Sequence, residues 1–197
     1  AEQLAARLPV VHFIDHGITI DQGDRARAAF EVYSNLRSNG THRVVRPGDP
    51  VPVTGLDVRV IASDGSVLTA PLAGAGDANP FCAGFTFHGE EITSRAGDAE
   101  DQRSVSAAVS YGEFRTIIMG DLTWNKEYDL MCPDSKVGAV DAYLVSHHGS
   151  ETSGSGALVH ALEPRVAIMN NGPRKGGATQ TFQILGTVES LDHLWQN

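Results

Sequence analysis

Two stretches of the sequence, FRTIIMGD (residues 114–121) and YLVSHHGS (residues 143–150), each begin with an apolar run and end in a polar cluster. Each run is short and apolar, which predicts a buried strand. A rigid strand fixes the position of the residues that follow it, so reactive side chains gather at strand ends. We therefore expect Asp121 and His147 to lie at the same end of neighbouring strands.

The residue types in these clusters are suited to metal chemistry. A carboxylate such as Asp121 can bridge two cations, which a two-metal hydrolase needs between its ions. Of the adjacent imidazoles, one can ligate a metal while the other orients water or donates a proton. Two ligands of one ion at 2.0–2.2 Å predict side chains within about 5 Å of each other. The bland alternative is two ordinary surface turns, since Gly-Asp is a common turn dipeptide.

Length, composition and charge limit the classes to which the protein can belong. The 197 residues carry a formal net charge of −9, with 41% apolar and 20% charged residues. This length and balance predict one ordered domain spanning residues 1–197. The acidic charge argues against extended nucleic-acid binding, although a metal could still supply positive charge for a phosphate ester. No apolar run reaches 18 residues, so we expect no membrane span.

The two cysteines leave one question open. Cys82 and Cys132 are 50 positions apart, which excludes a four-thiolate zinc site by count. A disulfide in an exported protein and two reduced core thiols are equally compatible with the sequence.

Hydrophobic periodicity predicts an α/β (α+β) fold. The expected helices cover residues 24–37, 156–162 and 179–185, and Trp124 and Tyr128 mark a further helix face. The expected strands cover residues 10–14, 42–46, 57–62, 104–111, 114–119, 137–146 and 165–169, followed by a turn near 191–195. Residues 71–101 are rich in Gly, Ala, Asp and Pro and are expected to form a loop or insertion.

The order of these motifs resembles the metallo-β-lactamase superfamily. Gly120-Asp121, a helical crossover, the cluster Ser146-His147-His148-Gly149-Ser150 and then Pro164 to Ile168 resemble most closely the hydrolase-like domain of bacterial DNA-uptake channel proteins. The resemblance covers about residues 100–172. It implies an αββα sandwich of two face-to-face sheets and one or two Zn²⁺ ions, or another divalent metal. It also implies that Asp121 and His147 are metal ligands, with Asp121 bridging, and that Asp121 and His148 are catalytic.

The sequence departs from the superfamily at its signature, H-x-H-x-D-H. The nearest match, Val11 to His16, keeps the final Asp-His, but His12 is out of phase. We expect that the chain begins just after the signature, which would leave it a fragment with weak metal binding and little activity. Asp15-His16 and Asn170-Asn171 are secondary candidates for lining the site.

The function expected from this resemblance is metal-assisted hydrolysis of an ester, phosphodiester or lactam bond in a small-molecule or phosphodiester substrate. The alternative is a non-catalytic descendant that keeps the scaffold and binds a ligand or partner. No residue distinguishes between the substrate classes, and the oligomeric state and cellular location stay open.

Overall fold

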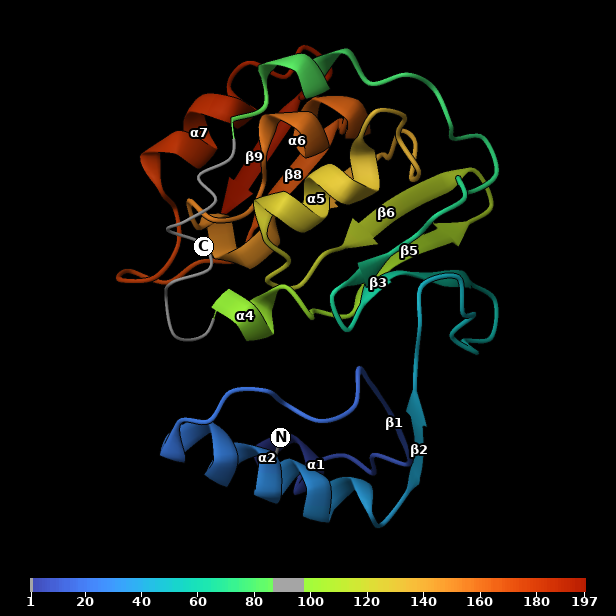
Figure 1. Ribbon diagram of the computed structural model, residues 1–197, viewed down its shortest axis with the longest axis vertical. Coiled ribbons are helices and arrows are strands. Elements are labelled where there is room, and N and C mark those ends of the chain that lie inside the picture. The colour runs from blue at the N-terminus through green and yellow to red at the C-terminus, as the bar shows by residue number, and fades with distance from the viewer. Residues whose placement is uncertain (1, 87–97) are drawn as a thin grey trace.

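A seven-stranded mixed sheet forms the body of the protein, with strand order β4-β3-β5-β6-β7-β8-β9 (Figure 1). The computed structural model describes residues 2–86 and 98–197. The strands are β3 (Asp57–Ser63), β4 (Ser66–Val67), β5 (Ser106–Tyr111), β6 (Phe114–Ile118), β7 (Ala142–Leu144), β8 (Val166–Met169) and β9 (His193–Gln196). The predicted mixed α/β class is confirmed.

The sheet has an antiparallel half and a parallel half. β3, β5 and β6 pair antiparallel, and β6 turns directly back from β5. β6, β7, β8 and β9 then pair in parallel. Parallel neighbours need crossover connections, which here contain α5 (Trp124–Met131), α6 (Gly156–Leu162) and α7 (Thr179–Leu185). The carboxyl ends of β6 to β9 therefore share one edge of the sheet.

The hydrophobic core lies between this sheet and the three helices. Apolar side chains from one sheet face pack against apolar side chains of α5, α6 and α7. The fully buried ones include Ile61, Ile117, Met119 and Tyr143 from the strands and their ends, and Leu130, Met131, Leu158 and Leu162 from α5 and α6. Ser155 caps α6 by accepting a hydrogen bond from the Leu158 amide. None of the helices within the described ranges has the length and apolar content needed to cross a membrane.

The opposite face of the sheet is apolar and largely exposed. Ile118, Leu144, Ile168 and Trp195 are in register across four parallel strands. Ile118 is 46% exposed, Ile168 43% and Trp195 64%. A sheet face open to water usually carries polar residues, so this face has the composition of a packing surface.

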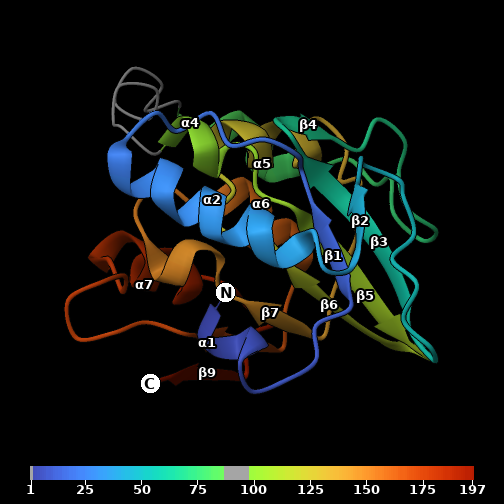
Figure 2. The ribbon, with the colours of Figure 1, turned by 90° about the horizontal axis from the view of Figure 1, so that it is seen from below.

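The N-terminal segment forms a small βαβ unit beside the main sheet. It contains α1 (Glu2–Ala5), β1 (His12–Asp15), α2 (Asp24–Arg37) and β2 (Thr41–Val44). β1 and β2 pair in parallel, with α2 as the connection between them. Figure 1 shows this unit at one end of the molecule, away from α5, α6 and α7, and Figure 2 views the molecule from that end.

The element boundaries agree with the sequence expectations where local signals were strong. The helices over 24–37, 156–162 and 179–185 are present with those bounds. The turn expected near 191–195 is wrong, because His193–Gln196 forms the edge strand β9 on β8. Within the stretch 71–101, η1 (Pro80–Gly84) and α4 (Asp98–Asp101) form, and residues 87–97 lie outside the described residues.

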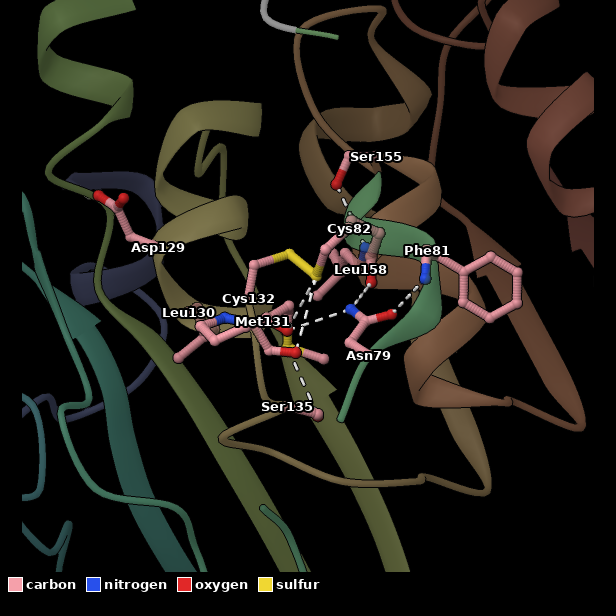
Figure 3. The surroundings of a disulfide bond; sticks show 12 residues. Asn79, Phe81, Cys82, Asp129, Leu130, Met131, Cys132, Ser135, Ser155 and Leu158 are labelled. Atoms are coloured by element: carbon pink, nitrogen blue, oxygen red, sulfur yellow. Dashed lines mark hydrogen bonds between the residues drawn. A yellow bond between two sulfur atoms is a disulfide. The ribbon is translucent and has the colours of Figure 1, made fainter. Parts of the chain in front are cut away.

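A disulfide bond joins Cys82 in η1 to Cys132 at the end of α5 (Figure 3). This answers the question that the sequence left open. Beside it, the Asn79 side chain donates hydrogen bonds to the carbonyls of Met131 (3.1 Å) and Ala157 (2.9 Å). The disulfide and this amide together attach η1 to α5 and α6.

Reduction of the disulfide is expected to lower the free energy of unfolding by about 2–4 kcal/mol, because the cross-link restricts the unfolded chain. The measurement is urea unfolding with and without reductant. The double variant Cys82→Ala/Cys132→Ala serves as control and should not respond to reductant. An unchanged midpoint for the reduced wild-type chain would contradict the expected contribution.

Candidate functional site

Asp121 and His147 lie side by side at the edge where β6 and β7 end. Nε2 of His147 is 3.7 Å from Oδ2 of Asp121. The His147 amide donates a 2.9 Å hydrogen bond to the Gly120 carbonyl, and the Asp121 amide donates one of 3.1 Å to the Ser104 hydroxyl. The expected proximity of the two side chains is present, and their role as metal ligands stays a prediction.

The backbone that carries the two histidines is left-handed. His147 has φ 50° and His148 has φ 57°, and Gly149 follows with φ 78°. Non-glycine residues in this region are uncommon, and such strain clusters at functional sites. A close approach stabilises the loop: the Gly177 amide donates to the His148 carbonyl. A Cβ on Gly176 would come within 2.0 Å of that carbonyl oxygen, so this contact requires glycine.

His148 points to a different partner from His147. Its Nδ1 lies 2.7 Å from the Asn170 carbonyl oxygen, so Nδ1 carries the proton and donates it. The Nε2 lone pair of a neutral His148 is then left for another group. Asn170 thus contributes at the site edge through its backbone, while the buried Oδ1 of Asn171 has no hydrogen-bond partner within the described residues.

Two hydroxyl groups approach the other ring nitrogen of His147. Thr152 Oγ1 and Ser153 Oγ each lie 3.3 Å from Nδ1. A hydroxyl oxygen that accepts from Nδ1–H leaves the lone pair on Nε2, the atom that faces Asp121. Sequence reasoning missed both residues, because nothing in the run Ser150 to Ser155 marks which hydroxyl turns inward.

A buried carboxylate lies beneath this segment. Glu127 in α5 has no exposed surface, and its two oxygens accept hydrogen bonds from the amides of Gly154 (2.7 Å) and Ser155 (2.8 Å). Burial raises the pKa of Glu127 to about 7, although both hydrogen bonds favour the ionised form and act in the opposite direction. Its position in a polar helical stretch gave no sequence signal of burial.

Asp121 and His147 are placed to supply two ligands of a zinc site, which is fewer than such a site needs. Two donors on one zinc ion lie within about 4.4 Å of each other, which the 3.7 Å separation satisfies. Zinc sites in proteins have three or four protein ligands. Within residues 2–86 and 98–197, no group of three or more His, Cys, Asp and Glu side chains is placed to hold a metal.

Asp15, a secondary candidate, is engaged within the N-terminal unit. Its carboxylate accepts hydrogen bonds from Tyr33 (2.7 Å), Arg37 (2.8 Å) and His42 (2.9 Å). Burial tends to raise the pKa of Asp15, but these hydrogen bonds hold it below its ordinary value. Asp15 therefore ties α2 and β2 to β1.

His16 reaches away from this cluster to α4. Its Nε2 lies 3.0 Å from Oε1 of Glu100, and the Ile20 amide donates to the other oxygen of the same carboxylate. Its Nδ1 is buried with no hydrogen-bond partner within the described residues. His16 thus links the N-terminal segment to the helix that precedes β5, and does not supply a third donor beside Asp121 and His147.

The buried carboxylate predicts a pH dependence of stability. The Glu127 pKa rises from 4.5 to about 7 on folding, so the unfolded chain loses this proton first as the pH rises. Stability from this group is therefore present below about pH 4.5 and is lost as the pH rises through about 7. Relative to Glu127→Gln, the wild type should lose about 3 kcal/mol across that window in urea unfolding. Parallel pH profiles would mean that the two amide hydrogen bonds cancel the effect of burial on the Glu127 pKa.

Comparisons with known proteins give a distant likeness to solved structures. No protein-family model and no curated protein matches the chain. Among solved structures, a Thermotoga maritima protein provisionally described as a Zn-dependent hydrolase of the metallo-β-lactamase superfamily aligns with a TM-score of 0.41 and 11% identity. The alignment covers 95% of this chain and 84% of that one. With about nine in ten aligned residues different, this likeness says nothing about which reaction the chain performs.

Proposed function

We propose that the protein is a metal-dependent hydrolase of the metallo-β-lactamase superfamily type. The observation that carries the proposal is the Asp121–His147 pair, whose Oδ2 and Nε2 atoms lie 3.7 Å apart at the shared edge of two parallel strands. The imidazole contacts hydroxyl groups at Nδ1, as metal-binding histidines contact oxygen acceptors at the ring nitrogen away from the metal.

The sheet supports the same proposal. In an αββα sandwich, each sheet packs helices on one face and the other sheet on its inner face. Here α5, α6 and α7 cover one face, and Ile118 and Ile168 are exposed on the other. The motif order from Gly120-Asp121 to the histidine cluster favours the branch that contains the DNA-uptake proteins.

Each site residue then has a role that follows from its contacts. Asp121 and His147 would hold Zn²⁺, which when bound lowers the pKa of a coordinated water and polarises the scissile bond. His148 has its Nδ1 proton committed to the Asn170 carbonyl, so its Nε2 is the atom that can accept or return a proton. The left-handed backbone keeps the two imidazole rings 6.4 Å apart between centroids.

The proposed substrates are those with a bond whose hydrolysis a zinc ion can assist. An ester, phosphodiester or lactam each offers an electrophilic centre and an oxygen that a zinc ion polarises. With a net charge of −9, the chain favours a small-molecule or single phosphodiester substrate over extended nucleic acid. We propose that the partners of this protein do not include a membrane.

A non-catalytic binding or scaffold protein of the same fold is the second candidate. It is favoured by the donor count, because the described residues supply two ligands and a catalytic zinc normally has three protein ligands. Asp121→Ala separates the two candidates. In a hydrolase it lowers turnover of phosphodiester, lactone or lactam substrates by orders of magnitude, and in a binding protein it leaves the binding function nearly intact.

Zinc titration of the 197-residue chain, followed by NMR, is expected to give a Kd of about micromolar or weaker, because two protein ligands hold the ion loosely. The largest shifts should fall on His147 and Asp121. Asp121→Ala and His147→Ala should each abolish them. Asp121→Ala should do so with little loss of thermal stability, since the Asp121 side chain is 36% exposed.

Asp192→Ala is the matched control. This exposed carboxylate pairs with Arg165 before β9, away from the edge where the site lies, so its removal should leave zinc binding unchanged. Wild-type zinc binding in Asp121→Ala would remove this residue from the site. Two zinc ions that survive dialysis would contradict the two-ligand account.

A further inference from the structure

A cavity of about 550 Å³ lies beside the start of β6, at the far end of this strand from the candidate site. Arg115, the second residue of β6, lines the cavity, whereas Asp121 follows the end of the same strand. Residues of β3, of β5 and of the segment 68–73, which follows β4, line it as well. The cavity is therefore separate from the proposed zinc site, and the proposed function does not use it.

Three polar residues lie in a row across the strands that line this cavity. Asp57 of β3 is in register with Ser110 of β5, and Ser110 is in register with Arg115 of β6. Side chains two residues apart on a strand share a face of the sheet, and Ile117 belongs to the core beneath the helices. Arg115 therefore lies on the face of the sheet that the helices cover, next to the core.

The segment 68–73 supplies apolar surface to the cavity and is held in place. Leu68 is buried in the hydrophobic core, and Leu72 packs against that core. The Leu68 amide donates a 3.0 Å hydrogen bond to the Ile61 carbonyl of β3. The Leu72 amide donates one of 2.9 Å to the Lys136 carbonyl, after α5. The cavity is thus formed without a ligand, and its volume is within the range of small-molecule sites.

Arg115 is a half-buried cation whose guanidinium group is only partly engaged. Its Nη2 donates to the carbonyl oxygens of Ala73, at 3.4 Å, and Val137, at 3.3 Å. Within the described residues, the guanidinium makes no other hydrogen bond and has no carboxylate within ion-pair distance. A guanidinium has five N–H donors, so those on Nε and Nη1 are left for another group. Pairing with an anion would offset the cost of burying this charge.

Two acidic side chains near Arg115 limit the charge that a ligand can carry. Asp57 lines the cavity, and its carboxylate is paired with Arg59, whose Nε lies 3.2 Å from Oδ1. Glu113, in the turn between β5 and β6, also lines the cavity and is exposed. A dianion such as hydrogen phosphate would be repelled by both carboxylates, whereas a single negative charge is enough to pair with Arg115.

We propose that this cavity binds a small monocarboxylate with an apolar body. The carboxylate pairs with the guanidinium of Arg115, because hydrogen bonds between two charged groups are roughly twice as strong as those between neutral groups. The apolar body lies against Leu68 and Leu72, where its removal from water adds affinity. A neutral ligand of the same shape would keep the second contact and lose the first.

Benzoate is the probe for this site, because it joins a carboxylate to an apolar ring, and benzamide is its neutral counterpart. The zinc-free chain is titrated with each compound near neutral pH and followed by NMR. Benzoate is expected to give saturable shifts at the residues that line the cavity, with a Kd of about millimolar. Benzamide should bind about tenfold more weakly or worse, because it cannot form an ion pair with Arg115. Inorganic phosphate should give no saturable shifts there.

Three variants test the roles of charge and of space in the cavity. Arg115→Gln removes the cation and should weaken benzoate binding about tenfold or more. Ala70→Phe places an aromatic ring in the cavity with Arg115 intact and should abolish binding. It keeps the inference testable if Arg115→Gln disturbs the contacts with Ala73 and Val137. Glu113→Gln removes a like charge and should bind benzoate at least as tightly as the wild type.

Arg165→Gln is the matched control. This exposed guanidinium pairs with Asp192 and does not line the cavity, so its removal should leave benzoate binding unchanged. Equal binding of benzamide and benzoate, tighter binding of phosphate, or loss of binding in Arg165→Gln would overturn the inference. So would wild-type binding in Ala70→Phe or Arg115→Gln, or weaker binding in Glu113→Gln. Because zinc takes no part, these titrations decide the site whether or not the protein is a hydrolase.

Discussion

Three consecutive residues, His147 to Gly149, hold a left-handed backbone, and the geometry of the candidate site depends on it. For each histidine this conformation costs on the order of 1–3 kcal/mol. Hydrogen bonds along the loop offset that cost: the His147 amide donates to Gly120, and the carbonyls of His148 and Gly149 accept from the segment before α7. Because these bonds come from β6 and from the α7 side, the loop is fixed only when the parallel half of the sheet is assembled. His147 then faces Asp121, and His148 faces the end of β8.

Much of this arrangement could be predicted from the sequence, because it depends on local signals. The apolar runs before Asp121 and His147 predicted two strands, and a crossover helix between them implied parallel pairing and a shared edge. The helix over 156–162 was recognisable from its apolar spacing and the proline that follows it. These features are set within ten or so residues of chain, where periodicity and terminal residues are informative.

The rest depended on contacts between distant segments. Glu127 lies in a run, WNKEYDLM, for which the sequence predicted only a helix face marked by Trp124 and Tyr128. The burial of the Glu127 carboxylate and its contacts with Gly154 and Ser155 are revealed by the fold. β9 was mistaken for a turn because its strand character comes from pairing with β8, and all its residues are exposed. The disulfide was undecided for the same reason, since the approach of Cys82 to Cys132 is set by η1 and α5.

The central claim is that Asp121 and His147 act together as metal ligands, and anomalous diffraction from crystals soaked in Zn²⁺ tests it most directly. The account predicts an anomalous peak at the zinc edge within about 2.0–2.2 Å of both His147 Nε2 and Asp121 Oδ2. A peak held by other side chains, or none at this pair while zinc is bound elsewhere, would contradict it.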